Sequence, residues 1–253
     1  MLNRELQHAN IKPRRRLGVS IPRNESEIIE AQRLRYAVFS GEMGARIETA
    51  RSGVDHDMFD PHCEHLLVRD NDTNEVVGTY RILPPRNAHR IGCYYSEQEF
   101  DLVRLAHLRP GLVEVGRSCI HPDYRSGSAI LLLWAGLTRY MSENRYAHMI
   151  GCASLSMGDG GHGAASIYQQ IKDRHLCPLE YRAFPRCRLP LERLDASRQA
   201  DLPPLVKGYL NVGAWICGEP AWDPDFNVAD LLILLPLANI RARYAQHFFA
   251  QAA

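Results

Sequence analysis

The stretch from Leu112 to Leu131 combines residue types that could carry out chemistry. It begins as an apolar run, passes through a loop rich in Pro, Asp, Gly and Ser, and ends in an apolar helical pattern. Glu114 and Arg117 lie inside the apolar run, where a charge is costly unless it is paired or functional. A carboxylate beside a loop that can bind an anion suits proton removal from an amine next to a phosphate-bearing donor. A buried salt bridge beside an ordinary loop is the alternative.

The spacing of Glu114 and Arg117 predicts a local irregularity in the strand. Residues three apart point to opposite faces unless a β-bulge redirects one of them, and Gly116 between them favours a bulge. A bulge would also free a backbone N–H that could stabilise the oxyanion of a reacting carbonyl. Glu114 would then act as general base, directly or through a water molecule.

A second set of charged residues could recognise an amino acid. The carboxylates of Asp57 and Asp60 and the guanidinium groups of Arg35, Arg81 and Arg117 supply an anion for an ammonium and a cation for a carboxylate. Arginine suits the second task because its planar fork binds a carboxylate through two hydrogen bonds. A purely structural network of ion pairs is the alternative interpretation.

Three other patterns are weaker. The run His62-Cys63-Glu64-His65 lacks the usual spacing of zinc ligands, so we expect no metal site. Cys119 is more typical of a small buried residue than of a nucleophile. The serines at 154 and 156 with His162 lack a nucleophile-elbow pattern, which argues against a serine triad.

The surrounding elements predict one mixed α/β (α+β) domain with a central sheet. Helices are expected from Asn24, as the N-cap, toward Phe39, over 97–108, from Ala164 to about Lys172, over 203–212 and over 241–249. Strands are expected at 17–21, 65–69, 76–83, 149–155, 214–217 and 228–235, besides the strand and helix of the central stretch. The basic segment 1–16 is expected to be a flexible arm, and residues 17–253 a single domain, because no linker separates two cores.

The bulk composition excludes several classes of protein. Of the 253 residues 45% are hydrophobic and 23% charged, and the formal net charge is +1, so nothing favours nucleic acid as a partner. No apolar run has membrane-spanning length, and the N-terminus lacks the apolar core of a signal peptide. Seven scattered cysteines are typical of free thiols in a reducing compartment. We therefore expect a cytoplasmic protein.

Several motifs resemble a known group of enzymes. Arg35-x-x-x-Phe39, Asp57-x-x-Asp60, Arg81 and Glu114-x-x-Arg117 are similar, in order and spacing, to the signature of acyl-homoserine-lactone synthases. The sequence outside these motifs resembles more closely the bacterial ornithine N-acyltransferases of ornithine-lipid synthesis. This second resemblance covers about residues 17–249 and includes the segments 78–84, 95–100, 116–122, 151–154, 207–210 and 218–223.

The resemblance implies a GNAT-like fold, with a twisted mixed sheet flanked by helices. It implies transfer of a long acyl chain, expected to be 3-hydroxyacyl, from acyl carrier protein to the α-amine of L-ornithine, giving lyso-ornithine lipid. No cofactor is implied beyond the acyl-phosphopantetheine of the carrier. Glu114 and Arg117 would be catalytic. The acceptor pocket would contain Arg35, Phe39, Asp57, Asp60 and Arg81, and the phosphate loop Arg125, Ser126, Gly127, Ser128 and Ala129.

Two departures from these families bear on the donor and the product. Tyr124 stands where the GNAT phosphate loop has Gln or Arg, which favours a carrier-protein donor over acetyl-CoA. The tryptophan that lactone synthases carry after the Arg/Phe pair is absent from 40–50. A lactone synthase, an acyltransferase for another amine and a non-catalytic module that binds acyl carrier protein remain alternatives. Peripheral membrane contact at the inner face, through the basic arm or Phe248-Phe249, is a further hypothesis.

Overall fold

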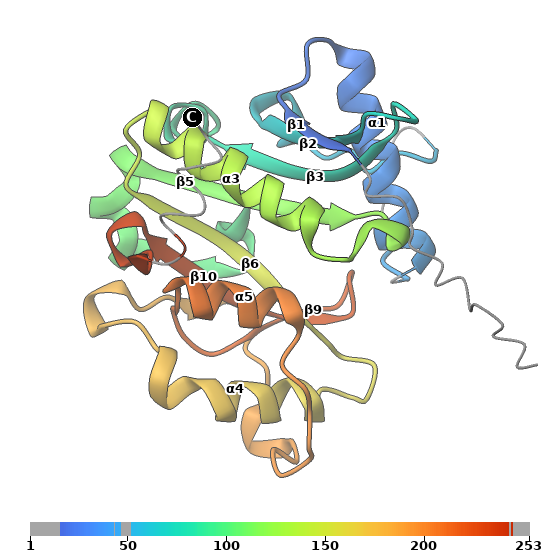
Figure 1. Cartoon of the computed structure of the whole chain (residues 1–253). Helices are drawn as coiled ribbons and strands as arrows, with labels where there is room; N and C mark the ends of the chain where they lie inside the picture. Colours follow the sequence, from blue (N-terminus) through green and yellow to red (C-terminus); the bar gives the residue numbers. More distant parts are fainter. Residues whose placement is uncertain (1–15, 43, 47–51, 243, 245–253) are drawn as a thin grey trace, which may run out of the picture.

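The computed structural model describes residues 16–42, 44–46, 52–242 and 244. Its core is an eight-stranded sheet that runs through the whole molecule (Figure 1). Along the main path the strand order is β1 (Leu17–Ser20), β2 (Glu64–Asp70), β3 (Val76–Leu83), β5 (Leu112–Ile120), β6 (His148–Ser156), β10 (Val228–Pro236) and β8 (Trp215–Ile216). β9 (Ala221–Asp223) also pairs with β10. β5 and β6 are parallel, and the other neighbours in this sheet are antiparallel.

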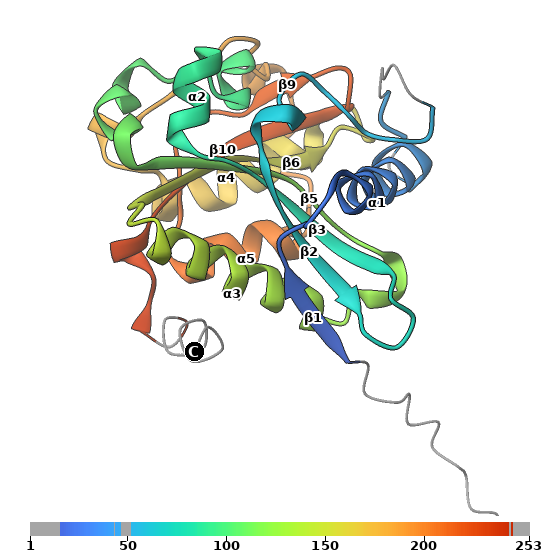
Figure 2. The same cartoon turned by 90° about the horizontal axis from the view of Figure 1, so that it is seen from above.

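Helices cover both faces of the sheet (Figures 1 and 2). One face carries α1 (Glu25–Tyr36) and α2 (Pro85–Ile91), and the other carries α3 (Ser128–Glu143), α4 (His162–His175) and α5 (Pro204–Val212). Successive side chains of β10 point to opposite faces of the sheet, and both faces are buried. Leu231 and Ile233 pack in the cluster of α4 and α5, whereas Leu232 and Leu234 pack in the cluster around Phe100. The predicted mixed α/β class is confirmed.

The start of α1 follows its sequence signal. The side chain of Asn24 accepts a hydrogen bond from the N–H of Glu27 at 3.1 Å, and Glu27 in turn accepts one from the N–H of Arg23 at 2.8 Å. These bonds satisfy N–H groups that have no partner within the helix. The helix does not end at Tyr36, because a π-helical turn (Ala37–Glu42) carries it past Phe39 toward the cavity described below.

The prediction of a helix over 97–108 is wrong. This segment forms two 3₁₀ segments, Tyr95–Gln98 and Val103–Gly111, on either side of the short strand β4 (Phe100–Asp101). β4 pairs with β7 (Phe184–Pro185) in a separate two-stranded sheet. The apolar residues at 100, 102, 105 and 108 are all buried, a spacing that suits no single α-helical face. The helix α2, with Pro85 at its first turn, was not predicted.

β5 and β6 separate part-way along the sheet. Their paired residues are 112–114 of β5 and 148–150 of β6, and beyond these no further pairs join the two strands in the described part of the chain. The diverging ribbons are visible in Figure 1. Residues of both strands beyond this point line a cavity. The separation therefore opens the middle of the sheet.

Two predicted segments fall outside the description. The basic arm 1–16 is described only at Arg16, whose guanidinium pairs with Asp72, and the predicted helix 241–249 is described only at 241, 242 and 244. Among the described residues, no helix combines the length and the apolar character needed to cross a bilayer.

Candidate active site

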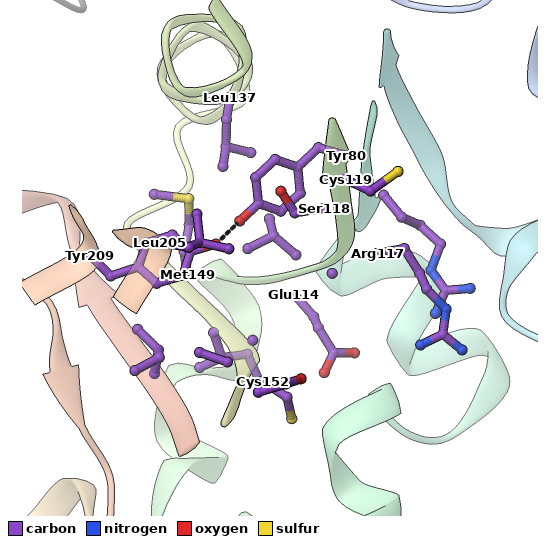
Figure 3. A pocket seen from close by; sticks show the side chains of 18 of the residues that line it. Tyr80, Glu114, Arg117, Ser118, Cys119, Leu137, Met149, Cys152, Leu205 and Tyr209 are labelled. Carbon is purple, nitrogen blue, oxygen red and sulfur yellow. Dashed lines mark hydrogen bonds between the residues drawn. The ribbon is translucent and has the colours of Figure 1, made fainter. Parts of the chain in front are cut away.

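A cavity of about 800 Å³ occupies the gap between β5 and β6. Its lining differs on the two sides of the sheet. Glu114, Cys152 and Asp230 alternate with residues of the α3–α5 side, so they belong to the face that carries α1 and α2. Tyr80, Met149 and Leu137 belong to the opposite face, and Figure 3 shows them apart from Glu114 and Cys152. The cavity thus has a polar half on one face and an apolar half on the other.

β5 contains the predicted irregularity. Opposite β3 the register moves from Thr79 paired with Cys119 to Arg81 paired with Gly116, so β5 carries one extra residue there. The residue with the left-handed backbone is Arg117, at φ 49°, rather than the glycine beside it. This bulge brings Arg117 to the polar half of the cavity, together with Glu114.

Glu114 is 4% exposed and accepts two backbone hydrogen bonds. The N–H of Tyr95 donates to Oε2 at 2.6 Å and the N–H of Ser96 to Oε1 at 2.7 Å. Burial raises the pKa of Glu114 above its ordinary value, and the donors at Ser96 and Tyr95 partly oppose this. The carboxylate therefore holds the 95–98 turn in place and also lines the cavity.

Three arginines and three aspartates form a closed ring in which the charges alternate. Arg35 pairs with Asp55 at 2.8 Å and with Asp60 at 2.7 Å. Asp60 also binds Arg81 at 2.9 Å, and Arg81 binds Asp57 at 2.7 Å. Arg117 closes the ring, with nitrogen–oxygen distances of 3.2 Å to Asp55 and 3.3 Å to Asp57. We refer to these six residues as the charge ring.

The ring keeps Asp60 and Arg81 ionised in spite of burial. Burial alone would raise the pKa of Asp60, but Arg35 and Arg81 hold it well below its usual value. Burial would lower the pKa of Arg81, but Asp57 and other anions raise it instead. Arg81 and Arg117 line the cavity, whereas Arg35 is fully buried and is not part of the lining. The ring therefore presents guanidinium groups to the cavity and keeps its aspartates behind them.

The predicted acceptor residues are thus only partly at the cavity. Phe39 and Arg81 line it, whereas Arg35, Asp57 and Asp60 do not and instead fix the orientation of Arg81 and Arg117. The geometry favours a positioning role for these three residues over direct contact with a substrate. Asp55, which the sequence analysis did not single out, completes the ring.

The predicted phosphate loop meets the cavity at the start of α3. Gly127, at φ 103°, precedes the first helical residue Ser128, and the cavity lining includes Arg125 and Gly127. The guanidinium of Arg125 binds Glu42 through two hydrogen bonds of 2.5 and 2.8 Å. Tyr124 donates its hydroxyl to Asp70 at 2.8 Å. Gly127 therefore brings the start of α3 to one edge of the cavity, whereas Ser126, Ser128 and Ala129 lie outside the lining.

The apolar half of the cavity is walled by α3, α5 and the late strands. Tyr80 and Tyr209 join their hydroxyl groups by a short hydrogen bond (Figure 3). Tyr209 stacks on Trp134, with ring centroids 5.7 Å apart. Leucine, isoleucine, valine and methionine side chains continue the wall, at Leu137, Met149, Leu205, Val212, Ile233 and Leu235. This half is suited to an alkyl chain.

The sequence analysis also missed three acidic residues of the polar half. Glu99, Asp223 and Asp230 line the cavity, and carboxylate oxygens from the three lie within 4.8 Å of one another. Asp230 carried a usable signal, because it is a charge inside the apolar strand 228–235, as Glu114 is in its own strand. The run His62-Cys63-Glu64-His65 forms no comparable cluster in the described part of the chain.

Comparison with known proteins places this site in a family. Residues 34–135 match the model of the acetyltransferase (GNAT) domain. The L-ornithine N(alpha)-acyltransferase of Agrobacterium fabrum is 35% identical, over 93% of this chain and 86% of the relative. The enzyme of the same name from Brucella abortus is 36% identical, over 93% of this chain and 90% of the relative. The chain belongs to the L-ornithine N(alpha)-acyltransferase family.

Solved structures agree on the fold of this acyltransferase. The acyl-homoserine-lactone synthase LasI superposes with a TM-score of 0.55, over 93% of this chain and 96% of that one, at 13% identity. FeeM, an N-acyl amino acid synthase from uncultured soil microbes, gives a TM-score of 0.51, over 92% and 99%, at 13% identity. At this identity the likeness shows the GNAT-like fold alone, as the sequence motifs predicted.

Proposed function

We propose that this enzyme transfers an acyl chain from the thioester of acyl carrier protein to the α-amine of L-ornithine. The observation that carries the proposal is the cavity through the sheet, with a charged half beside Glu114 and an apolar half behind it. An acyl donor needs the apolar half, and an amino acid acceptor needs the charged half. The names of the relatives specify ornithine as the acceptor.

The charge ring supplies the site for the α-carboxylate. Arg81 and Arg117 face the cavity, and both guanidinium groups lie against the ring of Tyr95, at 5.6 and 5.0 Å from its centroid. Their bonds to three aspartates fix the planes of both guanidinium groups in advance, so little entropy is lost when a carboxylate binds. The α-amine of the acceptor then projects toward Glu114.

Glu114 acts as the general base in this proposal. Its carboxylate, through a bridging water, takes a proton from the α-ammonium of ornithine, and the neutral amine attacks the thioester carbonyl carbon. Backbone N–H groups on the β6 side of β5, where the ladder has ended, stabilise the tetrahedral oxyanion. The carbon–sulfur bond then breaks, and the leaving thiolate takes the second proton lost by the nitrogen. The products are the amide, the free thiol and one proton released from Glu114.

The start of α3 holds the donor phosphate. The phosphopantetheine arm carries one phosphodiester, which a helix N-terminus can bind through its free N–H groups. Tyr124 does not reach into this loop, because its hydroxyl bonds to Asp70 on β2. A loop that has tyrosine in place of the Gln or Arg of the GNAT pattern suits the single phosphate of a carrier protein. The expected 3-hydroxyacyl chain would lie in the apolar half.

A negative charge introduced by mutation at the start of α3 tests the proposed donor site. Ser128→Asp places a carboxylate at the first helical position, where it stabilises the helix by about 0.3–1 kcal/mol. The same charge repels the donor phosphate, so we expect the donor KM to rise about tenfold, which corresponds to about 1.4 kcal/mol. Steady-state kinetics with purified acyl carrier protein would measure this change.

Ser142→Asp is the matched control for that variant. It adds the same charge to an exposed serine at the other end of α3, near its last residue Glu143. This variant should leave the donor KM unchanged. Equal donor KM values for the two variants would rule out the start of α3 as the phosphate site.

The acceptor and the product are tested by lipid analysis. Cells that express the protein and are fed ornithine should accumulate ornithine carrying one amide-linked 3-hydroxyacyl chain, detected by mass spectrometry. An acylated homoserine lactone would instead identify a lactone synthase, and another acylated amine would replace ornithine as the acceptor. If no acylated amine forms, a role in binding acyl carrier protein would replace catalysis. Because the product is amphipathic, the proposal includes a cytoplasmic protein that touches the inner face of the membrane, testable by flotation with anionic liposomes.

A further inference from the structure

Three acidic residues, Glu99, Asp223 and Asp230, gather at the polar end of the cavity. Among the described residues, no lysine or arginine forms an ion pair with Glu99, Asp223 or Asp230, whereas each arginine of the charge ring binds two aspartates. Three carboxylates gathered without a cation repel one another. Such a group is costly to maintain in a folded protein unless a ligand compensates for it.

Glu99 supplies the second sign of a missing ligand. Its Oε2 atom is fully buried and has no hydrogen-bond partner among the described residues. Glu99 also lines the cavity, together with Asp223 and Asp230, so its carboxyl group borders the space that a ligand would fill. Buried acceptors are almost always satisfied, and an exception in a cavity indicates a donor that is absent from the free protein.

The other two carboxylates are held in place by local bonds. Asp230 is 3% exposed, and its Oδ1 accepts the hydroxyl of Ser154 at 2.7 Å. Asp223 accepts the N–H groups of Asp225 and Phe226 through Oδ1, at 2.9 and 3.2 Å. These bonds engage Oδ1 of each residue and fix the orientation of both carboxyl groups. The arrangement is therefore a preformed set of acceptors.

The chemistry of this set fits a primary ammonium. An alkylammonium group has three N–H donors around one nitrogen, and three carboxylates can accept one each. Asp230 lies on the same face of the sheet as Glu114, and Glu114 lines the same cavity as the three carboxylates. The α-amine and a side-chain ammonium of one short molecule can therefore reach both at once.

We propose that Glu99, Asp223 and Asp230 form the subsite that binds the side-chain ammonium of a diamino acid, and that they thereby direct acylation to its α-amine. This inference rests on the proposed function and deepens it. The side-chain amine is held protonated by its carboxylates and cannot attack the thioester, whereas the α-amine meets Glu114 and loses its proton. Together with the arginines that hold the carboxylate, the subsite recognises the acceptor at three points.

Titration of the subsite supports the same assignment. Burial, with the neighbouring charges of Asp230 and Asp223, raises the pKa of Glu99 to about 9. Burial and the charge of Asp223 raise the pKa of Asp230 to about 6, although hydrogen bonds with Ser154 and Glu99 and the charge of Arg117 lower it. The free site thus retains a proton at neutral pH. An ammonium that binds there favours the ionised form, so binding of ornithine should release a proton, and norvaline should not cause this release.

The test compares ornithine with norvaline, which has the same carbon chain and no side-chain amine. The wild-type enzyme should favour ornithine strongly, and Glu99→Gln and Asp230→Asn should each lower the ornithine-to-norvaline ratio of kcat/KM by about 30-fold or more. A fraction of the ornithine product of each variant should carry the acyl group on the side-chain nitrogen. Titration calorimetry in buffers of different ionisation enthalpy would measure the proton release.

Glu180→Gln is the control for the loss of one negative charge, because Glu180 is exposed and lies outside the cavity lining. It should leave the substrate ratio unchanged. A ratio that stays at the wild-type value in Glu99→Gln and Asp230→Asn would overturn the proposal, even if ornithine is acylated normally. Activity on ornithine that requires a divalent cation, bound by the wild type and lost in Asp230→Asn, would assign the carboxylates to a metal instead. If the wild type acylates neither substrate, the proposed function itself fails.

Discussion

Replacement of Glu114 by glutamine is expected to lower kcat by about 10² to 10⁴-fold, the usual contribution of a general base. The variant cannot take the proton of the α-ammonium, but it keeps the shape of the side chain. In the wild type, kcat should rise with pH as Glu114 ionises, and burial moves this rise above the ordinary pKa of a glutamate. The variant should lack that acid limb. Steady-state rates across the pH range would measure both effects.

The structural role of Glu114 requires a control. Both of its oxygens accept backbone N–H groups of the 95–98 turn, and a glutamine offers only one oxygen, so one buried N–H loses its acceptor at a cost of about 1–3 kcal/mol. Glu97→Gln makes the same chemical change in the same turn. Glu97 also accepts a backbone N–H, that of Tyr94 at 2.7 Å, but it lies outside the cavity lining. This control should lose stability and keep its kcat.

The two variants separate the base from the scaffold. If Glu97→Gln loses turnover as severely as Glu114→Gln, the defect comes from displacement of the turn. A wild-type rate in Glu114→Gln would exclude the residue as the base. Urea unfolding of both variants, at the temperature of the kinetic measurements, shows whether each variant is folded when its rate is measured.

The site was predictable from sequence where a charge interrupts an apolar strand. Glu114 and Arg117 stood out for this reason, and the bulge between them followed from the strand period. The same argument applied to Asp230 but was not made. Asp223 ends the three-residue strand β9, and Glu99 lies between a 3₁₀ turn and the short strand β4, where a carboxylate is unremarkable. The pairing of β9 with β10 brings Asp223 close to Asp230, whereas Glu99 comes from a distant segment before β4, so no local pattern predicts that the three converge.

The fold was predictable where the pattern is local and strong. The hairpin of β2 and β3, the helix α3 and the cap at Asn24 each follow from turn, periodicity or capping signals. The prediction for 97–108 failed because the apolar residues of this segment are buried along an irregular backbone. Pro110 lies in the last 3₁₀ segment and disfavours an α-helix there. The charge ring also escaped full prediction, since Asp55 joins it from a loop with no periodic pattern.

Asp60→Asn is expected to lower the free energy of unfolding by about 3–5 kcal/mol, because it leaves buried cations without their shared partner. Asp60 bridges Arg35 and Arg81, and the buried part of the ring admits little water to replace it. The folded pKa of Asp60 lies below its unfolded value near 4, so its stabilisation is present in full above that pH. It is lost as the pH falls toward the folded pKa, and the variant should lack this acid-dependent loss. Urea unfolding at several pH values would measure it.

The exposed pair of Arg139 and Glu143 provides the comparison. Its nitrogen–oxygen distance, 2.7 Å, equals that of Arg35 and Asp60, but both of its side chains are more than half exposed. Glu143→Gln should therefore cost about 0.5 kcal/mol or less. The ring variant should also raise the KM for ornithine, since Arg81 loses one of the two carboxylates that orient it. Similar small costs for both variants would mean that burial adds nothing to the ring. An unchanged KM for ornithine would mean that the ring does not position Arg81 for the acceptor.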